Sequence, residues 1–222
     1  MILYDNIQKV RDEVLKTGRE VTMLAACKTQ TKQTVDDFMK VAPDFVLGEN
    51  RVQELLAKYD ARYRWDFIGR LQTNKVKYII DKAELIHSLD REELAKEIEK
   101  RAAAHGKTQK CLVEINMGSE ISKGGVSPDG AMDFIKSLAD YGHIEIDGLS
   151  AVMPNTDDEA LLHSYYDRLY ALFESAKSLS QSNANVRYLS AGMSNDYKIA
   201  LAHGANIIRL GRILFGERQK IV

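Results

Sequence analysis

Eight short apolar runs alternate with stretches of helical periodicity along the 222-residue chain. Each run has the length and near-continuous apolarity of a central strand in a parallel sheet, which helices cover on both faces. Strands are expected at residues 21–27, 45–47, 65–69, 85–87, 111–115, 144–149, 186–189 and 206–210. Because no linker or low-complexity segment interrupts this repeat, the pattern predicts one α/β domain spanning residues 1–222, a single (β/α)8 TIM barrel. An open doubly wound sheet is the competing topology. It ranks second because no Gly-x-Gly-x-x-Gly follows the first run.

Helices are expected between these strands, with boundaries marked by capping residues and glycines. An opening helix over residues 3–17 ends at Gly18, and a helix over residues 73–81 precedes the fourth strand. The longest helix is expected after the sixth strand. Helix starts are predicted at Thr31, at Asp90 with Glu93 in capping-box spacing, at Ser127 before Pro128, at Thr156 with Glu159, and at Ser194.

Charge and composition argue against several classes of protein. Charged residues make up 28% of the chain, yet the formal net charge is -1, which gives no electrostatic reason to expect nucleic acid or an anionic membrane as a partner. No apolar run approaches the roughly 18 residues that span a bilayer, and Asp5 interrupts any amino-terminal signal core. We therefore expect a cytoplasmic protein. Cys27 and Cys111 lie in apolar runs without metal-ligand spacing, which indicates buried reduced thiols and no metal site.

The first apolar run ends at a lysine, Lys28. In α/β barrels, ligands bind at the carboxyl ends of the strands, so an amine there meets a pocket. Partial desolvation lowers the pKa of an amine and makes it available for Schiff-base chemistry. A solvated loop lysine is the alternative interpretation of Lys28.

Small residues after the seventh run indicate an anion site. Residues 189–196, Leu-Ser-Ala-Gly-Met-Ser-Asn-Asp, lead directly into a predicted helix, and Gly211 follows the eighth run. Barrels often bind phosphate at these two loops, where backbone N–H groups are accessible. An ordinary Ser-capped helix preceded by a turn glycine explains the same residues equally well.

Arg209 lies inside the eighth apolar run, where alternation places its side chain opposite that of Ile208. A buried guanidinium must find partners, and a bound ligand or a structural ion pair would supply them. Arg209 therefore favours the anion-site interpretation without deciding it.

Several motifs occur together in one order along the chain. They are Lys28, Gly48-Glu49-Asn50, Ile68-Gly69-x-Leu71-Gln72, Gly148-Leu149, Leu189-Ser190-x-Gly192-Met193-Ser194 and Arg209-Leu210-Gly211. In these motifs the sequence resembles the YggS/PROSC family of pyridoxal-phosphate-binding proteins, nearly from end to end. The resemblance implies a barrel similar to that of alanine racemase, pyridoxal phosphate fold type III, without the C-terminal β-domain of racemases.

The resemblance also implies roles for individual residues. Lys28 would form the internal aldimine, a Schiff base with the cofactor pyridoxal 5'-phosphate. The phosphate would lie against Ser190, Gly192, Met193, Ser194 and Gly211. Arg209 would face the pyridine nitrogen and Asn50 would lie beside the ring. Because a guanidinium only donates hydrogen bonds, Arg209 would keep that nitrogen unprotonated and restrain carbanion chemistry.

Four further residues bear on this site. Asp66 and Arg212 depart from the family pattern, which more often has a histidine and a hydroxyl residue at these positions; Arg212 would replace a phosphate contact with charge or point to solvent. Lys123 matches a family position at the same end of the barrel, although a solvated loop lysine is favoured there. His87 is interpreted as a core or rim histidine with local hydrogen bonds.

The resemblance implies a binding protein for pyridoxal phosphate that acts in intracellular vitamin B6 and amino-acid homeostasis, with apo-enzymes that use this cofactor as candidate acceptors. We expect a monomer or weak dimer. An amino-acid racemase of the same cofactor class is the first alternative. A Schiff-base aldolase acting on a sugar phosphate without a cofactor is the second, since a barrel lysine with a phosphate corner would serve it too.

Overall fold

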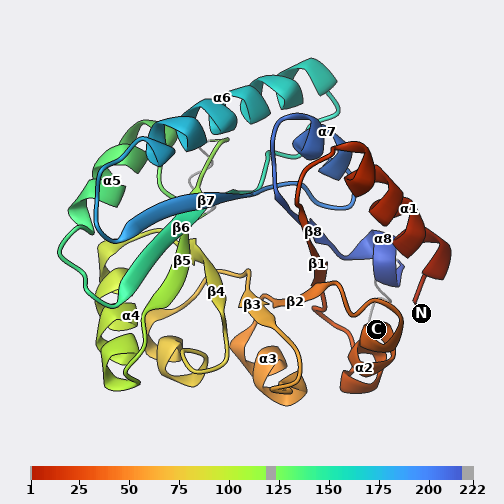
Figure 1. The fold of residues 1–222 in the computed structure, drawn as a ribbon, viewed down its shortest axis with the longest axis horizontal. Coiled ribbons are helices and arrows are strands. Elements are labelled where there is room, and N and C mark those ends of the chain that lie inside the picture. Colours follow the sequence, from red (N-terminus) through yellow and green to blue (C-terminus); the bar gives the residue numbers. More distant parts are fainter. Residues whose placement is uncertain (1, 119–123, 217–222) are drawn as a thin grey trace.

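The computed structural model describes residues 2–118 and 124–216, in which eight parallel strands close into a barrel in chain order (Figure 1). The strands are β1 Thr22–Ala26, β2 Val46–Glu49, β3 Trp65–Phe67, β4 Leu85–Leu89, β5 Gln109–Ile115, β6 Ile144–Ala151, β7 Ala184–Ser190 and β8 Ile207–Leu210. All eight predicted strands are present, and the (β/α)8 barrel is confirmed.

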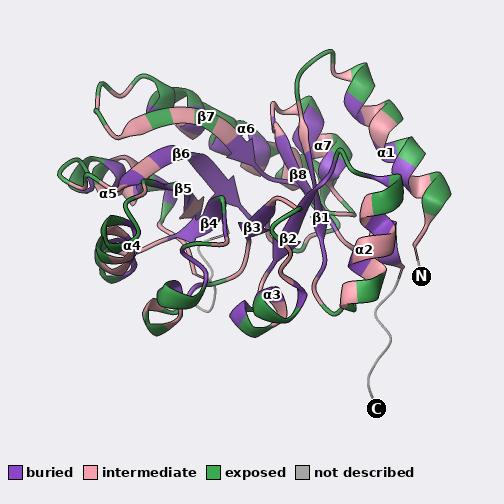
Figure 2. Ribbon diagram, turned by 60° about the horizontal axis from the view of Figure 1, so that its bottom comes forward, coloured by how far each residue is buried: buried purple, intermediate pink, exposed green. Residues whose placement is uncertain are grey.

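Helices surround the barrel (Figure 1). They are α1 Tyr4–Lys16, α2 Lys32–Val41, α3 Val52–Lys58, the 3-10 helix η1 Thr73–Tyr78, α4 Glu92–Ala104, the 3-10 helix η2 Pro128–Gly130, α5 Ala131–Ser137, α6 Glu159–Lys177, α7 Tyr197–Ala202 and α8 Arg212–Phe215. Figure 2 shows most strands buried inside helices whose outer faces are exposed, whereas the first part of β7 is intermediate or exposed. Among the described residues, α6 is the longest helix, as predicted, and no helix is long and apolar enough to cross a membrane.

Strand alternation divides the apolar side chains between the barrel interior and the layer beneath the helices. On β1, Leu24 and Ala26 face inward, while Ala25 and the next residue after the strand, Cys27, pack outward with α1 and α2. The inner cluster consists of Leu24, Ala26, Val46, Leu85, Leu112 and Ile207, with Ile68 and Tyr188 partly buried against it. Inward positions nearer the carboxyl ends of the strands therefore line the barrel mouth.

The seam between β7 and β8 is the most sparsely paired part of the barrel wall. Only Ser190 and Ile207 pair in register, whereas β5 and β6 pair over seven positions. Next to this pair, the Asn206 side chain accepts from Leu189 N at 2.7 Å and donates to Arg187 O at 2.7 Å. Its amide adds to three backbone hydrogen bonds across this seam, from Asn206 N to Leu189 O, from Ala191 N to Ile207 O and from Arg209 N to Gly192 O.

Several predicted helix boundaries need correction. Thr31 caps α2 as predicted, its side chain accepting from Thr34 N, and the predicted Ser127 cap accepts from Gly130 N. The capping box at Asp90 is wrong: α4 begins after Arg91, because the Asp90 carboxylate instead accepts from Arg91 and from Gly125 N.

The capping box at Thr156 is also wrong. Asp158 caps α6 by accepting from Leu161 N, while the Thr156 hydroxyl accepts from Asp158 N. The segment predicted as a helix over 73–81 is the 3-10 helix η1, whose tight turns bury Val76 and the following Ile79 in the outer core.

Candidate functional site

Lys28 lies in the turn that directly follows β1. The parallel ladder continues to Cys27, whose N–H donates to Gly48 O at 2.9 Å. The alternation that places Leu24 and Ala26 inside the barrel therefore brings Lys28 to its inner rim. Its side chain is half-buried there.

The ends of β2 and β8 flank this turn. Ala26 pairs with Gly48 on β2, two residues before Asn50, and Ala25 pairs with Leu210 on β8, one residue before Gly211. A Cβ built on Gly211 would lie 3.6 Å from Ala26 O. The strand end that carries Lys28 therefore lies between Asn50 and the glycine of the predicted phosphate corner.

Ser194 joins the loops after β7 and β8. Its hydroxyl oxygen accepts from Gly211 N at 3.3 Å and from Ile213 N at 3.2 Å. The predicted role of Ser194 as the cap of α7 is wrong, because that helix follows Asp196, whose carboxylate accepts from Met193 N at 2.7 Å. The Ser194 hydroxyl contacts Gly211, 17 residues further along the chain, instead of capping α7. Local spacing could not reveal this contact.

The loop after β7 leaves backbone donors available. In the described part of the chain, the N–H groups of Ser194 and Asn195 have no acceptor. Gly192 shapes the loop: it has φ +90, and a Cβ there would lie 2.6 Å from the Ala200 Cβ. Backbone N–H groups without acceptors on a loop of small residues are suited to an anion. Arg212 adds charge nearby, its side chain donating to Asn195 Oδ1 at 3.0 Å.

Arg209 is buried inside the barrel and bonded to oxygen atoms of two neighbouring strands. Its Nη1 donates to Ser190 O at 2.8 Å and to Ser190 Oγ at 2.6 Å, and its Nη2 donates to Ala151 O at 2.6 Å. The alternative of a structural ion pair is not realised, since no carboxylate of the described residues lies within ion-pair distance of this guanidinium. Burial lowers the pKa of Arg209. The Ser190 hydroxyl accepts a hydrogen bond from Arg209.

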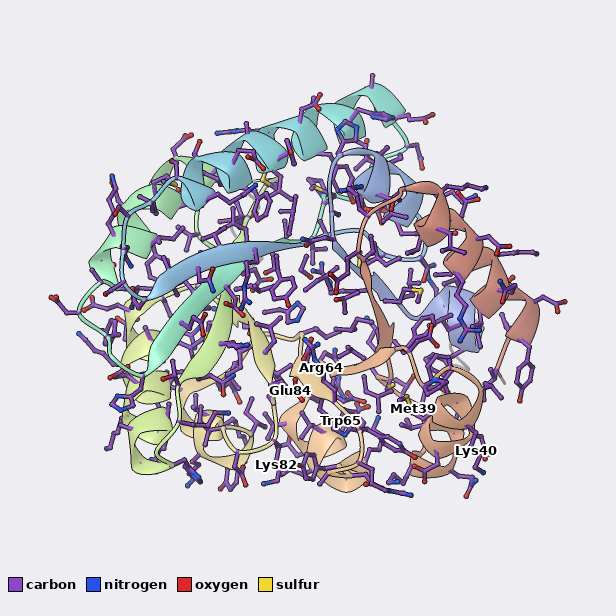
Figure 3. The ribbon with its side chains drawn as sticks, in the orientation of Figure 1. Met39, Lys40, Arg64, Trp65, Lys82 and Glu84 are labelled. Atoms are coloured by element: carbon purple, nitrogen blue, oxygen red, sulfur yellow. The ribbon has the colours of Figure 1, made fainter. Side chains whose placement is uncertain are left out.

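A buried polar chain continues from Ser190 across the barrel. Its hydroxyl lies 3.0 Å from Nδ1 of His87, and Nε2 of His87 lies 3.3 Å from Asp66 Oδ2. The prediction of local hydrogen bonds for His87 is confirmed. Beyond Asp66, Arg64 Nε lies 3.1 Å from Glu84 Oε2, and Figure 3 shows these two side chains next to each other.

Asn50 presents an unsatisfied group to the mouth. Its Oδ1 is buried and has no hydrogen-bond partner in residues 2–118 and 124–216. Gly69 fixes the Asn50 backbone, because a Cβ on Gly69 would lie 2.2 Å from Asn50 O. A buried acceptor without a partner, two residues after the Gly48 that pairs with Ala26, fits a site that receives a ligand with a donor group.

Four charged residues of this region were given no role in the sequence analysis. Glu49 and Lys58 form a buried ion pair that Glu54 joins, beneath the Lys28 turn. The spacing of Glu54 and Lys58 on one helix face was the available signal. Glu114, on β5, is half-buried, and its burial raises its pKa while Arg209 opposes the shift. Lys123, also considered for the site, lies outside the described residues.

Comparison with known proteins now assigns the family. Residues 3–219 match the family model of the alanine racemase N-terminal domain. Over 219 residues the chain is 38% identical to a pyridoxal phosphate homeostasis protein of Aquifex aeolicus, covering 97% of this chain and 95% of that protein. The chain belongs to the pyridoxal phosphate homeostasis protein family. A member of this family from Helicobacter pylori is 34% identical over 203 residues, covering 89% of this chain and 88% of its own length.

Solved structures agree with the family fold. PipY of Synechococcus elongatus, with pyridoxal phosphate bound, matches with a TM-score of 0.84 at 24% identity, covering 96% of this chain and 99% of its own. Alanine racemase of Clostridium difficile matches with a TM-score of 0.74 at 14% identity, and the shared region is 62% of that enzyme. The predicted likeness to the racemase barrel is confirmed at the level of fold.

Proposed function

We propose that this chain, as one domain over residues 1–222, binds pyridoxal 5'-phosphate as a Schiff base on Lys28 and acts in cytoplasmic vitamin B6 and amino-acid homeostasis. The observation that carries the proposal is the adjacency of Ala26 and Gly211, which brings the lysine-bearing turn of β1 beside the loop after β8. The names of the family members that cover nearly the whole chain support the same conclusion.

The residues at the mouth fit this cofactor. When bound, pyridoxal phosphate supplies an aldehyde that condenses with a primary amine and releases one water. Lys28 provides that amine, and the backbone N–H groups of Ser194 and Asn195 provide donors for the phosphate. We assign the cofactor contacts to Lys28, Asn50, Ser190, Gly192, Met193, Ser194, Arg209 and Gly211.

Arg209 restricts the chemistry of the ring site. Its guanidinium can only donate hydrogen bonds, and its Nη atoms are fixed by Ser190 and Ala151. A permanently charged donor facing the pyridine nitrogen would keep that nitrogen unprotonated and weaken the ring as an electron sink. A weak electron sink favours a protein that holds and releases the cofactor, with apo-enzymes as acceptors. We further infer that the protein is a monomer or weak dimer.

An absorption spectrum with chemical trapping tests the proposal. The purified chain mixed with pyridoxal phosphate should become yellow, and borohydride reduction should remove the visible band and fix the cofactor mass on the Lys28 peptide. A colourless protein would contradict the proposal and favour the sugar-phosphate aldolase. Rapid formation of D-alanine from L-alanine by the yellow protein would instead identify a racemase.

A further inference from the structure

A buried charged cluster lies beneath the turn that carries Lys28. It joins Glu49 at the end of β2 with Glu54 and Lys58 on α3. The Lys58 ammonium pairs with the Glu49 carboxylate and lies 3.2 Å from Glu54 Oε2. The Glu49 side chain is fully buried and that of Lys58 is 5% exposed. Burial raises the pKa of Glu49, and Lys58 opposes this shift.

This cluster binds the two peptide groups that flank Lys28. Lys58 Nζ donates to Cys27 O at 2.9 Å, and Thr29 N donates to Glu54 Oε2 at 2.8 Å. Because Lys58 and Glu54 also contact each other, the backbone is held on both sides of Lys28 by one connected set of charges. The cluster lies outside the barrel wall, so it acts on Lys28 through the backbone.

The turn has a conformation that requires such support. Thr29 has φ 67, and it is the only non-glycine residue with positive φ among the described residues. A β-branched residue is strained in this left-handed region, and strain of this kind persists only where surrounding contacts hold it. The Thr29 N–H that Glu54 accepts belongs to that strained residue.

We propose that Glu54 and Lys58 are positioning residues for Lys28, holding its turn so that the amine is presented at the barrel mouth. This role rests on the proposed function, since Lys28 must be the residue that receives the cofactor. A long lysine side chain reaches a fixed aldehyde efficiently only if its backbone has one orientation. A buried ion cluster often contributes less to the stability of a fold than apolar side chains of the same volume would. We therefore interpret this cluster as one that specifies the conformation of the turn.

Two substitutions of Glu54 separate the hydrogen bond from the rest of the side chain. Glu54→Ala removes the acceptor for Thr29 N–H, whereas Glu54→Gln keeps an acceptor oxygen. We expect Glu54→Ala to weaken pyridoxal phosphate binding about tenfold, the effect of losing one hydrogen bond to a charged group, and Glu54→Gln to bind within about threefold of wild type.

Hydrogen exchange supplies a readout that needs no cofactor. The Thr29 amide should exchange about tenfold faster in Glu54→Ala than in wild type, while amides of α3 are little changed. Glu92→Ala is the matched control: Glu92 pairs with Lys96 across one turn of α4, the spacing that relates Glu54 to Lys58, and lies far from β1. It should leave both readouts unchanged. Circular dichroism checks that each variant is folded.

A double substitution tests Lys58. Because Lys58→Met alone would strand the Glu49 charge, it is combined with Glu49→Gln, and we expect about tenfold weaker binding. Wild-type affinity in folded Glu54→Ala or in the folded double variant would overturn the positioning role while leaving the proposed function intact. Failure of wild type to bind the cofactor at Lys28 would remove the proposed function, and the positioning role with it.

Discussion

Nε2 of His87 lies 3.3 Å from the carboxylate of Asp66, inside the barrel and out of contact with solvent. Here the pair connects β3 to β4 and continues through Ser190 to Arg209. One polar chain therefore links the residue expected at the ring nitrogen to the opposite side of the barrel.

The burial of His87 predicts a pH dependence of stability. Burial lowers the pKa of His87, and Asp66 only partly offsets this. The unfolded chain therefore takes up a proton near pH 6.5, the ordinary value, whereas the folded chain does so only at lower pH. Stability contributed by neutral His87 is full above pH 6.5 and is lost as pH falls below it, by at most about 1.4 kcal/mol per unit.

Urea unfolding at several pH values between 5 and 8 measures this contribution. In His87→Gln the loss of stability on acidification should be smaller than in wild type, because the titrating group is gone. His105→Gln, at the exposed end of α4, is the control and should follow the wild-type profile. Parallel pH profiles for wild type and His87→Gln would contradict the prediction.

Lys28→Ala should abolish the visible band and leave the fold intact. The side chain is half-buried in a turn, so its removal is expected to change the free energy of unfolding by less than about 1 kcal/mol. Absorbance with pyridoxal phosphate and thermal unfolding followed by circular dichroism measure the two effects. Lys32→Ala, four residues on and paired with Asp36, should keep the band. A persistent band in Lys28→Ala would place the cofactor on another lysine.

Ser194→Ala should weaken cofactor binding by about five- to tenfold. Removing the hydroxyl leaves Gly211 N and Ile213 N without their acceptor, which releases the loop after β8. The lost hydrogen bonds correspond to about 1 kcal/mol. Titration of the visible band gives the affinity. Ser137→Ala, whose hydroxyl donates to Phe134 O on exposed α5, should have wild-type affinity, and an equal loss in both variants would disprove the role of Ser194.

Gly192→Ala should be more disruptive than Gly18→Ala. Both glycines have positive φ, but a Cβ at Gly192 would lie 2.6 Å from the Ala200 Cβ, whereas a Cβ at Gly18 meets nothing within 4 Å. We expect a loss of about 1 kcal/mol for Gly18→Ala, from conformation alone, and of about 2–4 kcal/mol for Gly192→Ala. Urea unfolding compares them. Equal losses would show that the contact with α7 is easily relieved.

The barrel could be predicted because each strand carries its signal locally. The runs that became β1 and β8 are almost entirely apolar, as is typical of a buried strand, and the inward position of Arg209 follows from alternation. The opening helix needed only its spacing and Gly18. For these elements, local pattern and tertiary environment agree.

Predictions failed where a polar side chain had a choice of partners. Asp90, Thr156 and Ser194 have the chemistry of helix caps. Asp90 and Ser194 instead accept from backbone N–H groups of distant segments, and Thr156 accepts from Asp158 N, two residues on. Glu49 and Lys58 were missed because their contact depends on how α3 packs against β2. Local spacing shows that such a residue can cap a helix. It does not show which other hydrogen-bond partner the folded chain offers.

The sparse pairing of β7 with β8 has a consequence for how the barrel responds to a bound anion. The loops that Ser194 joins leave the wall on the two sides of that weak seam. An anion bound by both loops would add a contact across this seam, beyond the backbone hydrogen bonds from Ala191 N to Ile207 O and from Arg209 N to Gly192 O. Binding of the anion would then also strengthen the closure of the barrel between β7 and β8.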